Sequence, residues 1–339
     1  MASLGIVSYR LGGADGVSVE AAKWADAFSQ LGHSVRFIAG AGPSRVHVVE
    51  GLAMVSATPV DRKALNEALE DLDLVIVENL CSLPLNPEAS SAVASALQGR
   101  PAIMHHHDLA WQRPDTVAFG APPVDPAWRH VTINRRSQEE LAQYGIESRC
   151  LYNRFVMNPP EGHRASTRAS LDVGVHERLV VQPTRALPRK NVPAGLHLAE
   201  QLSASYWLTA AAEDGYQAAL DDVLLSAKTR TLRGPGPGTI DDVYAASDLV
   251  VLPSTWEGFG NPTLESVTHR KPLALGSYPV ADEIRSFGFQ FFHLDDIDAL
   301  SAALDEPDAN QLDRNFAIAQ EHFDLSDLPG ELHALLGDF

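Results

Sequence analysis

Short apolar runs alternate with helix-like segments along almost the whole chain, and this alternation limits the possible folds more than any other feature. The runs are rich in Val, Ile and Leu, whereas the segments between them carry apolar residues at helical spacing. The pattern predicts strands over residues 4–8, 34–39, 74–78, 102–106, 130–134, 149–152, 179–183, 206–210, 229–232, 249–253 and 273–275. Strands that alternate with helices form parallel sheets covered on both faces, so the sequence predicts an α/β fold.

One stretch interrupts the alternation and divides the chain into two similar halves. Helices are predicted over residues 19–31, 65–72, 88–98, 138–144, 194–203, 215–224, 240–246 and 262–269. Residues 153–168 contain Asn158, Pro159, Pro160 and Gly162 without a clear period, which is typical of a linker. In doubly wound sheets ligands bind at the carboxyl ends of the strands, so two facing halves predict a deep cleft between two domains.

Composition and charge narrow the class of protein. The 339 residues suit two domains, and 26 Lys and Arg against 44 Asp and Glu give a net charge of −18. A surface this acidic repels nucleic acids and anionic lipids, so we expect no nucleic-acid partner. Cys81 and Cys150 are too few for a disulfide framework and predict free thiols.

Two further features bear on the compartment. Residues 1–10 have no basic segment followed by an apolar one, and so do not resemble a signal peptide. The apolar runs are far shorter than the roughly 20 residues that cross a bilayer. We therefore expect a cytoplasmic protein without a transmembrane segment.

The most informative segment is residues 252–265, which leave an apolar run through a glycine-rich turn and enter a predicted helix. Gly258 and Gly260 allow the backbone to approach a ligand closely. Pro262 suits the start of the helix because its missing N–H needs no partner there. The unpaired N–H groups at a helix start attract anions, so this turn is a candidate phosphate site.

Two glutamates and a basic turn add to this candidate site. Glu257 and Glu265 can accept hydrogen bonds from ligand hydroxyls, although they can also simply complement the helix dipole. Arg185 offers a fork and Lys190 a point charge to phosphate oxygens. Such cations can offset the negative charge of a phosphate group without a metal, and no set of hard oxygen ligands is evident. A solvated basic turn is the alternative, and Arg189 in the same run is expected to be exposed.

Three consecutive histidines, His105, His106 and His107, end one predicted strand and are followed by Asp108. Successive strand residues point to opposite faces, so the three rings cannot all bind one ion. We therefore expect no metal site here. A histidine satisfied by its neighbours is the alternative to a functional role for His107.

Together these motifs resemble the retaining glycosyltransferases of family 4. The run Glu-Gly-Phe-Gly-x-Pro-x-x-Glu from Glu257 to Glu265 is similar to the family's two glutamates with seven residues between them. Arg185 and Lys190 resemble the cations that grip the donor diphosphate. Further likenesses are Gly12-Gly13 in the first loop, His107-Asp108 after a strand, Asn153 at the end of the first half and residues 316–336 as a tail helix. The resemblance covers nearly the whole chain and implies the GT-B fold, two facing Rossmann-like domains.

The resemblance also implies roles for individual residues. His107 would hydrogen-bond the donor sugar, Glu257 would hold sugar hydroxyls, and Glu265 would hold the nucleotide ribose. The residues expected to be catalytic are His107, Glu257, Arg185 and Lys190. The further donor-binding residues expected are Gly13, Gly16, Gly258, Phe259, Gly260, Asn261, Pro262 and Thr263. The residues expected on the acceptor side are Asp15, Asp108 and Trp111, with loop packing as the alternative for Trp111.

The domains implied are an acceptor-side domain over residues 1–155, a sugar-nucleotide domain over 156–315, and a tail helix over 316–339 that returns to the first domain. The function implied is retaining transfer of a hexose from a UDP- or GDP-linked donor to a hydroxylated small molecule or glycan. No cofactor is needed beyond the substrates, because the leaving phosphate oxygen takes the acceptor's proton. Two alternatives stay open: a sugar-nucleotide epimerase of the same architecture, and a non-catalytic sugar-nucleotide-binding protein.

Overall fold

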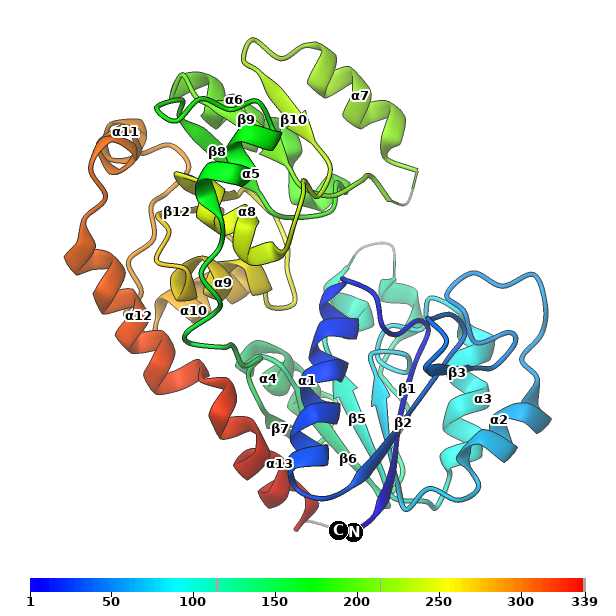
Figure 1. Ribbon diagram of the computed structural model, residues 1–339. Helices are drawn as coiled ribbons and strands as arrows, with labels where there is room; N and C mark the ends of the chain where they lie inside the picture. Colours follow the sequence, from blue (N-terminus) through cyan, green and yellow to red (C-terminus); the bar gives the residue numbers. More distant parts are fainter. Residues whose placement is uncertain (114–115, 214, 338–339) are drawn as a thin grey trace. The chain divides into compact units, whose positions relative to one another are not determined.

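The computed structural model describes residues 1–113, 116–213 and 215–337. The chain divides into two compact units, one of Met1–Asn153 with Ser326–Phe339 and one of Arg154–Leu325 (Figure 1). The second unit extends beyond the predicted boundary at residue 315, because helix α12 (Ala309–Phe323) packs against helix α9 (Asn261–Thr268) of that unit. Within the described residues, no helix is long and apolar enough to cross a membrane.

The first unit is built on a seven-stranded sheet in the order β3-β2-β1-β4-β5-β6-β7. Its strands are β1 (Ser3–Ser8), β2 (Ser34–Ala39), β3 (Val46–Val48), β4 (Leu74–Glu78), β5 (Ala102–His106), β6 (Trp128–Thr132) and β7 (Ser148–Cys150). All neighbours pair in parallel. Strands β4 and β5 are buried along their whole length, as expected where helices cover both faces. The edge strand β3, which is short and largely exposed, is one that the sequence pattern did not predict.

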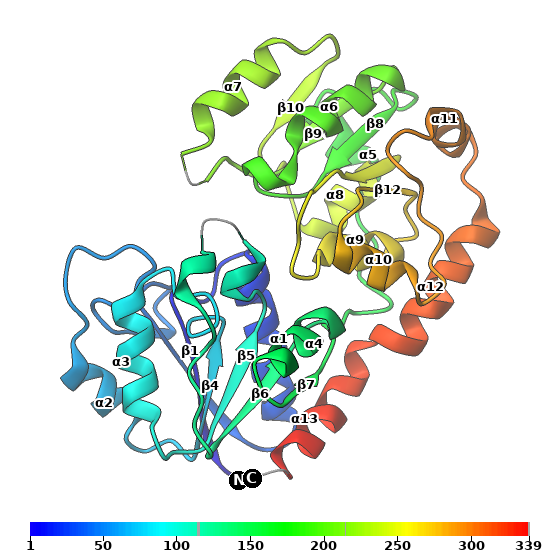
Figure 2. The ribbon, with the colours of Figure 1, turned by 180° about the vertical axis from the view of Figure 1, so that it is seen from behind.

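Helices cover both faces of this sheet (Figures 1 and 2). They are α1 (Gly16–Gln30), α2 (Arg62–Leu69), α3 (Pro87–Leu97), α4 (Arg135–Gln143) and α13 (Leu328–Leu336). Helices α2 and α3 pack on one face, where Val75 and Val77 of β4 join a core with Leu65 and Val93. On the other face α1 lies beside α13, which brings the C-terminal part of the chain into the first unit.

The second unit has a five-stranded parallel sheet in the order β10-β9-β8-β11-β12. Its strands are β8 (Leu179–Gln182), β9 (Ser205–Leu208), β10 (Thr231–Arg233), β11 (Leu249–Leu252) and β12 (Leu273–Leu275). Its other helices are α5 (Arg164–Ser170), α6 (Val192–Gln201), α7 (Gln217–Leu225), α8 (Ile240–Ala246), α10 (Pro279–Arg285) and α11 (Ile297–Asp305). Alternate residues of β8 face opposite cores: Val180 packs with Leu196 of α6, and Val181 packs with Val243 of α8.

The predicted linker is not uniformly irregular, because its last five residues belong to helix α5. The Arg168 side chain is buried and donates hydrogen bonds to the carbonyl oxygens of Gly174 and Ala246. Arg164 also forms an ion pair with Asp248. Helices α10 and α11 were likewise not predicted.

The predicted tail helix is two helices. Helix α12 ends before Asp324, where the chain leaves the helix to pair with Phe155. Phe155 donates from its backbone N to Phe323 O at 2.8 Å, and Leu325 N donates to Phe155 O at 2.8 Å. Residues 338–339 of the predicted tail lie outside the described residues. Within the described residues, neither Cys81 nor Cys150 forms a disulfide, in line with the sequence prediction.

A buried pair of histidines lies between two strands of the first sheet. The rings of His106 (β5) and His130 (β6) stack at 5.2 Å, and Nε2 of His106 lies 2.9 Å from Nδ1 of His130. One nitrogen donates and the other accepts, so at least one ring is neutral. Burial lowers the pKa of His130 to about 4, and burial followed by the neighbouring His130 charge lowers the pKa of His106 well below its ordinary value.

This pair predicts that the first unit loses stability in mild acid. The folded pKa values lie below the unfolded value near 6.5, so the unfolded state takes up protons first as the pH falls from about 6.5 toward 4. His130 alone should reduce the free energy of unfolding by about 2 kcal/mol at pH 5. In urea unfolding at pH 7 and pH 5, the double variant His106→Leu/His130→Val should lose less stability than the wild type.

The matched control is His197→Gln, because the His197 side chain is 69% exposed. This variant should lose as much stability between pH 7 and pH 5 as the wild type. An acid dependence that is the same in the double variant and the wild type would show that the buried pair does not titrate on unfolding.

Candidate active site

The glycine-rich turn after β11 leads into α9 as the sequence predicted. Gly260 is the N-cap residue with φ 86°, a left-handed conformation that favours glycine, and a Cβ there would lie 2.8 Å from the Tyr278 hydroxyl. Pro262 occupies the first turn of α9. Gly260 is therefore required by both its conformation and its close neighbours.

Not every group of this turn is directed outward. The Thr263 N–H, which was expected to face a phosphate, donates to Gly260 O at 2.8 Å within the turn itself. Phe259 is only 3% exposed and stacks on Phe155, with Phe323 at its edge. The structure therefore places the Phe259 ring in the core of the second unit, where it anchors the turn. The Gly258 and Asn261 positions are partly exposed.

Glu257 lies at the centre of a charged cluster in the second unit. Lys190 Nζ donates to Glu257 Oε1, Ser254 Oγ donates to the same oxygen at 2.6 Å, and Arg189 Nη1 donates to Oε2 at 2.7 Å. Trp256 O also accepts from Arg189. Burial alone would raise the pKa of Glu257, but the charges of Lys190 and Arg189 outweigh it and hold the pKa at about 2. Glu257 is thus a buried, ionised carboxylate.

The expectation that Arg189 is exposed is wrong, because its guanidinium pairs with Glu257 and only 25% of its side chain is accessible. Lys190 lies deeper, and burial lowers its pKa although Glu257 opposes this effect. The two residues end a short 3-10 turn, Pro188–Lys190, and the residue that follows it, Asn191, takes φ 48°. This turn aims two successive basic side chains at one carboxylate, a geometry that the spacing of the residues could not reveal.

Arg185 and Glu265 have partners of their own in this unit. Arg185 Nη1 lies 2.5 Å from Glu213 Oε2 in a partly exposed pair. The Tyr244 hydroxyl donates to Glu265 Oε2 at 2.7 Å, and the Tyr244 ring stacks on His269 at 4.4 Å. These contacts fix the orientation of the Glu265 carboxylate before any ligand binds.

The first loop of the other unit requires glycine at a position different from those predicted. Gly12 has φ 79°, and a Cβ there would lie 2.7 Å from Cδ of Pro43. Gly16 begins α1, and a Cβ there would meet no heavy atom of the described chain within 4 Å. A Cβ at Gly13 would approach only the Asp15 side chain, at 3.1 Å, and Ser18. Of these three positions, Gly12 is therefore the one where the backbone conformation and the close neighbours require glycine.

The two aspartates expected on the acceptor side have local partners. Asp15 is the N-cap of α1, where its carboxylate accepts from Ser18 N at 3.2 Å and lies 3.2 Å from Arg10 Nε. Asp108 Oδ2 accepts from Arg113 Nη2 at 2.8 Å. Asp15 therefore has a clear structural function, and the acceptor role of both residues stays a prediction.

Trp111 lies in a 3-10 turn, Ala110–Gln112, that packs on α4. Its ring stacks on Tyr144 at 4.4 Å, and its Nε1 donates to Glu140 Oε2 at 2.9 Å. One ring face is thus covered by protein, which is the packing alternative stated for this residue. A contact with an acceptor stays a prediction.

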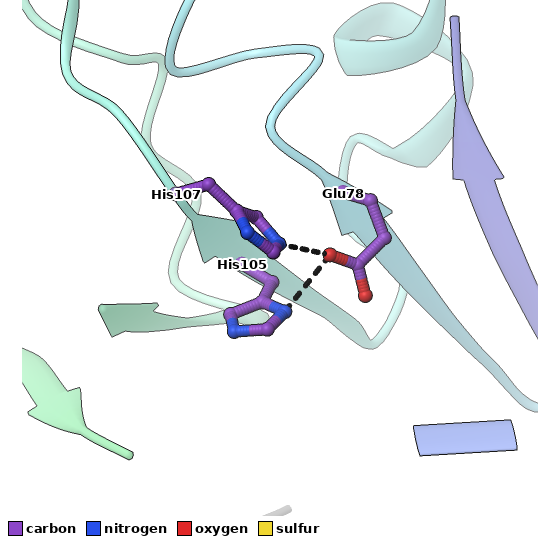
Figure 3. A group of neighbouring side chains, drawn as sticks. All are labelled: Glu78, His105 and His107. Atoms are coloured by element: carbon purple, nitrogen blue, oxygen red, sulfur yellow. Dashed lines mark hydrogen bonds and ion pairs between the residues drawn. The ribbon is translucent and has the colours of Figure 1, made fainter. Parts of the chain in front are cut away.

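His107 belongs to a buried triad with His105 and Glu78 (Figure 3). Glu78 Oε2 lies 2.7 Å from Nε2 of His107 and 2.9 Å from Nδ1 of His105. As strand alternation predicts, His105 and His107 share one face and His106 points to the other. Glu78, the last residue of β4, was not identified from the sequence, because no motif marks it and its contact with the two histidines arises only from the pairing of β4 with β5.

The triad has the composition of a metal site, but its spacing is that of hydrogen bonds. Two ligand atoms each about 2.0–2.1 Å from a tetrahedral zinc ion lie about 3.3 Å apart. The distances of 2.7 and 2.9 Å from Glu78 Oε2 to the two rings are shorter and fit N–H···O bonds. The structure therefore favours a charged hydrogen-bonded triad, and the absence of a metal stays a prediction.

Comparison with known protein families finds a match for most of the second unit. Residues 164–316 match the family described as glycosyl transferases group 1. This segment is a glycosyltransferase domain. It contains Arg185, Lys190, Glu257 and Glu265, and the sequence prediction of a glycosyltransferase is confirmed. The match does not test the assignment to family 4.

Two curated relatives share the same name, mannosylglucosylglycerate synthase. The protein from Petrotoga mobilis is 25% identical over 86% of this chain and 86% of its own length. The protein from Thermotoga maritima is 24% identical over 96% of this chain and 97% of its own length. The similarity to both relatives therefore runs through both units.

Solved structures show the same fold. The Anabaena protein Alr3699/HepE in complex with UDP and glucose is 17% identical, with a TM-score of 0.77 over all of both chains. Sucrose-phosphate synthase from Thermosynechococcus elongatus is 13% identical, with a TM-score of 0.71 over 100% of this chain and 99% of its own. At these identities the likeness concerns the fold, and it confirms the predicted GT-B architecture.

The charged cluster predicts that replacing Glu257 lowers the stability of the second unit much more than replacing Glu213. Replacing Glu257 by Ala leaves Lys190 and Arg189 without their carboxylate, and breaking a buried ion pair in this way costs about 3–5 kcal/mol. Replacing Glu213 by Ala removes a partly exposed partner of Arg185 and should cost less than about 1 kcal/mol. Urea unfolding of the two variants, measured on the transition of the second unit, checks the prediction. Equal losses would show that the Glu257 cluster does not stabilise the fold.

Proposed function

We propose that this protein is a retaining glycosyltransferase of family 4 that transfers a hexose from a nucleotide-diphosphate sugar to a small hydroxylated acceptor. The observation that carries the proposal is the cluster of basic side chains beside the glycine-rich start of α9, within a glycosyltransferase domain. A cationic cluster in a protein of net charge −18 fits an anionic ligand.

The donor diphosphate is assigned to the basic groups of the second unit. Arg185, Arg189 and Lys190 carry three positive charges, and their partners Glu213 and Glu257 carry two negative charges, which leaves a net charge of +1. A diphosphate that binds here meets preorganised cations, and these offset the charge that develops as the diphosphate leaves. Glu257 holds Lys190 and Arg189 in place, and its remaining acceptor capacity serves the sugar hydroxyls.

The sugar nucleotide is assigned two further contacts. Glu265, oriented by the Tyr244 hydroxyl through Oε2, accepts hydrogen bonds from the nucleotide ribose through Oε1. In the first unit, His107 donates a hydrogen bond to the donor. UDP and GDP are both candidate carriers, and the HepE structure in complex with UDP-glucose favours UDP.

The relatives' shared name supports a small acceptor. Both are named for the synthesis of mannosylglucosylglycerate, a small glycoside of glycerate, and the chain matches them over most of its length. We assign to this protein a hydroxylated acceptor of the same size class. A bond forms between the acceptor oxygen and the anomeric carbon as the bond from that carbon to the phosphate oxygen breaks. The acceptor proton passes to the leaving phosphate oxygen on the same face, so the anomeric configuration is retained.

Replacing Glu265 by Gln tests the donor site. The amide still accepts from Tyr244 but loses the charge that strengthens a hydrogen bond to the ribose, so KM for the donor should rise about tenfold or more. The assay follows release of UDP or GDP from UDP-glucose and GDP-mannose with glycerate and its glucoside as acceptors. Circular dichroism should show an unchanged fold.

Glu321→Gln is the matched control, because the Glu321 side chain is 75% exposed in the same unit and its variant should keep wild-type kinetics. The anomeric proton signal of the product reports the stereochemistry. An inverted product would contradict retention, an isomerised sugar nucleotide formed from donor alone would favour the epimerase, and full activity of Glu265→Gln would contradict the site.

A further inference from the structure

Two neighbouring residues at the end of β4 hold the turn that follows β5. Glu78 contacts the imidazole of His107 with its side chain, and Asn79 contacts the backbone of the same residue. Because β4 and β5 pair in parallel, with Glu78 opposite His105, their carboxyl ends meet at one edge of the sheet. The position of His107 is thus fixed by contacts with residues that lie almost thirty positions earlier in the sequence.

Asn79 fixes the backbone of the turn. Its side-chain Oδ1 accepts from His107 N at 3.0 Å and from Asp108 N at 2.9 Å, and Ser82 Oγ lies 3.1 Å from the same oxygen. Asn79 has φ 58°, a left-handed conformation that asparagine tolerates better than most residues. Its own backbone N donates to His105 O at 2.8 Å. Two consecutive amides of the turn are therefore tied to one carbonyl oxygen.

Glu78 fixes the rings. Its carboxylate is fully buried and meets an imidazole nitrogen from each of two histidines, Nδ1 of His105 and Nε2 of His107. A carboxylate only accepts, so both of these nitrogens carry protons. The His105 ring is also held from the side by Trp24, which stacks on it at 4.2 Å with 26° between the planes.

The two rings differ in where a positive charge can reside. Nε2 of His105 is buried without a hydrogen-bond partner among the described residues, so a second proton there would bury an unsatisfied donor. His105 is therefore the neutral ring. In His107, Nε2–H donates to Glu78, so a second proton would be carried by Nδ1. The charge that balances the Glu78 carboxylate then lies on His107.

We propose that Glu78 is a positioning residue that holds His107 as an imidazolium and presents its Nδ1–H to an oxygen of the sugar nucleotide. This inference rests on the proposed function, and adds to it the charge state of His107 and the residue that sets it. A charged N–H is a stronger donor than a neutral one and would favour an oxygen that gains negative charge during transfer.

The ionisable groups around His107 agree with this assignment. They are Glu78 of β4, Glu20 of α1, and His105, His106 and Asp108 of its own strand end. Burial by itself lowers the pKa of His107, but the hydrogen bond and charge of Glu78 outweigh it and raise the pKa above its ordinary value. For His105 burial prevails and its pKa is lowered. Burial would raise the pKa of Glu78, but the two rings hold it at about 2.

The test is the ring titration of His107 in the full chain, followed by nitrogen-15 NMR on histidine-labelled protein. Its signals are assigned by their loss in His107→Gln. In the wild type we expect His107 to be protonated at Nε2 throughout and to titrate at Nδ1 above the ordinary histidine value. In Glu78→Gln the midpoint should fall, because the amide keeps a hydrogen bond but carries no charge. An unchanged midpoint would overturn the proposal.

Steady-state kinetics with UDP-glucose and GDP-mannose then measure the role of Glu78 in glycosyl transfer. Glu78→Gln should lower kcat/KM about tenfold at pH 7.5, with part of the loss recovered toward lower pH, where His107 regains its proton. The control is Glu67→Gln, whose side chain is 63% exposed in the same unit and which should match the wild type. A shifted midpoint with unchanged kcat/KM would overturn the role of Glu78 in transfer.

Two further arms complete the test. If Glu78→Gln does not fold, Glu78→Asp keeps the charge and should keep the raised titration of His107, whereas a midpoint at the ordinary value would contradict the proposal. Binding of UDP alone distinguishes a phosphate oxygen from a sugar oxygen as the acceptor of the His107 Nδ1–H. Glu78→Gln weakens UDP binding if the oxygen belongs to phosphate and leaves it unchanged if the oxygen belongs to the sugar. If the wild type turns over no sugar nucleotide, the proposed function fails while the titration still decides the coupling of Glu78 to His107.

Discussion

Each unit of this protein buries one ionised glutamate at or just beyond the carboxyl end of a parallel strand, and the polar side chains around it depend on that charge. Glu78 ends β4 and binds the rings of His105 and His107. Glu257 follows β11 and binds Lys190 and Arg189. A buried carboxylate is costly unless donors and opposite charges surround it, so each glutamate determines where several other side chains must lie.

The parallel sheets explain why these groups occur where they do. In a parallel sheet all strands end at the same edge, and each strand contributes the residues that follow it to that edge. In the first unit this edge gathers Asn79 and His107 beside Glu78, and in the second it gathers Arg185 and the start of α9. The apolar residues of the strands supply the stability, which leaves the strand ends free to carry polar groups that are expensive to bury.

The alternation of apolar runs and helical segments predicted most of the fold. Strands β2, β4, β5 and β12 begin and end where the sequence pattern placed them, because their Val, Ile and Leu residues are flanked by turns. The pattern failed where stability comes from distant partners. Helix α5 depends on Arg164 and Arg168, which bond to residues near Asp248, and the break after α12 depends on pairing with Phe155.

The sequence by itself determined the fold class and the glycosyltransferase domain, and it singled out Arg185, Lys190, Glu257 and Glu265 as candidates, because turn chemistry and motif spacing are local properties of the chain. Only the tertiary structure decided which side chains meet. It joined Glu78 to His107, brought Arg189 onto Glu257, and moved the demand for glycine in the first loop to Gly12. The physical reason is that the burial and pairing of charges depend on which strands are neighbours in the sheet. No single segment of the sequence determines the order of the strands.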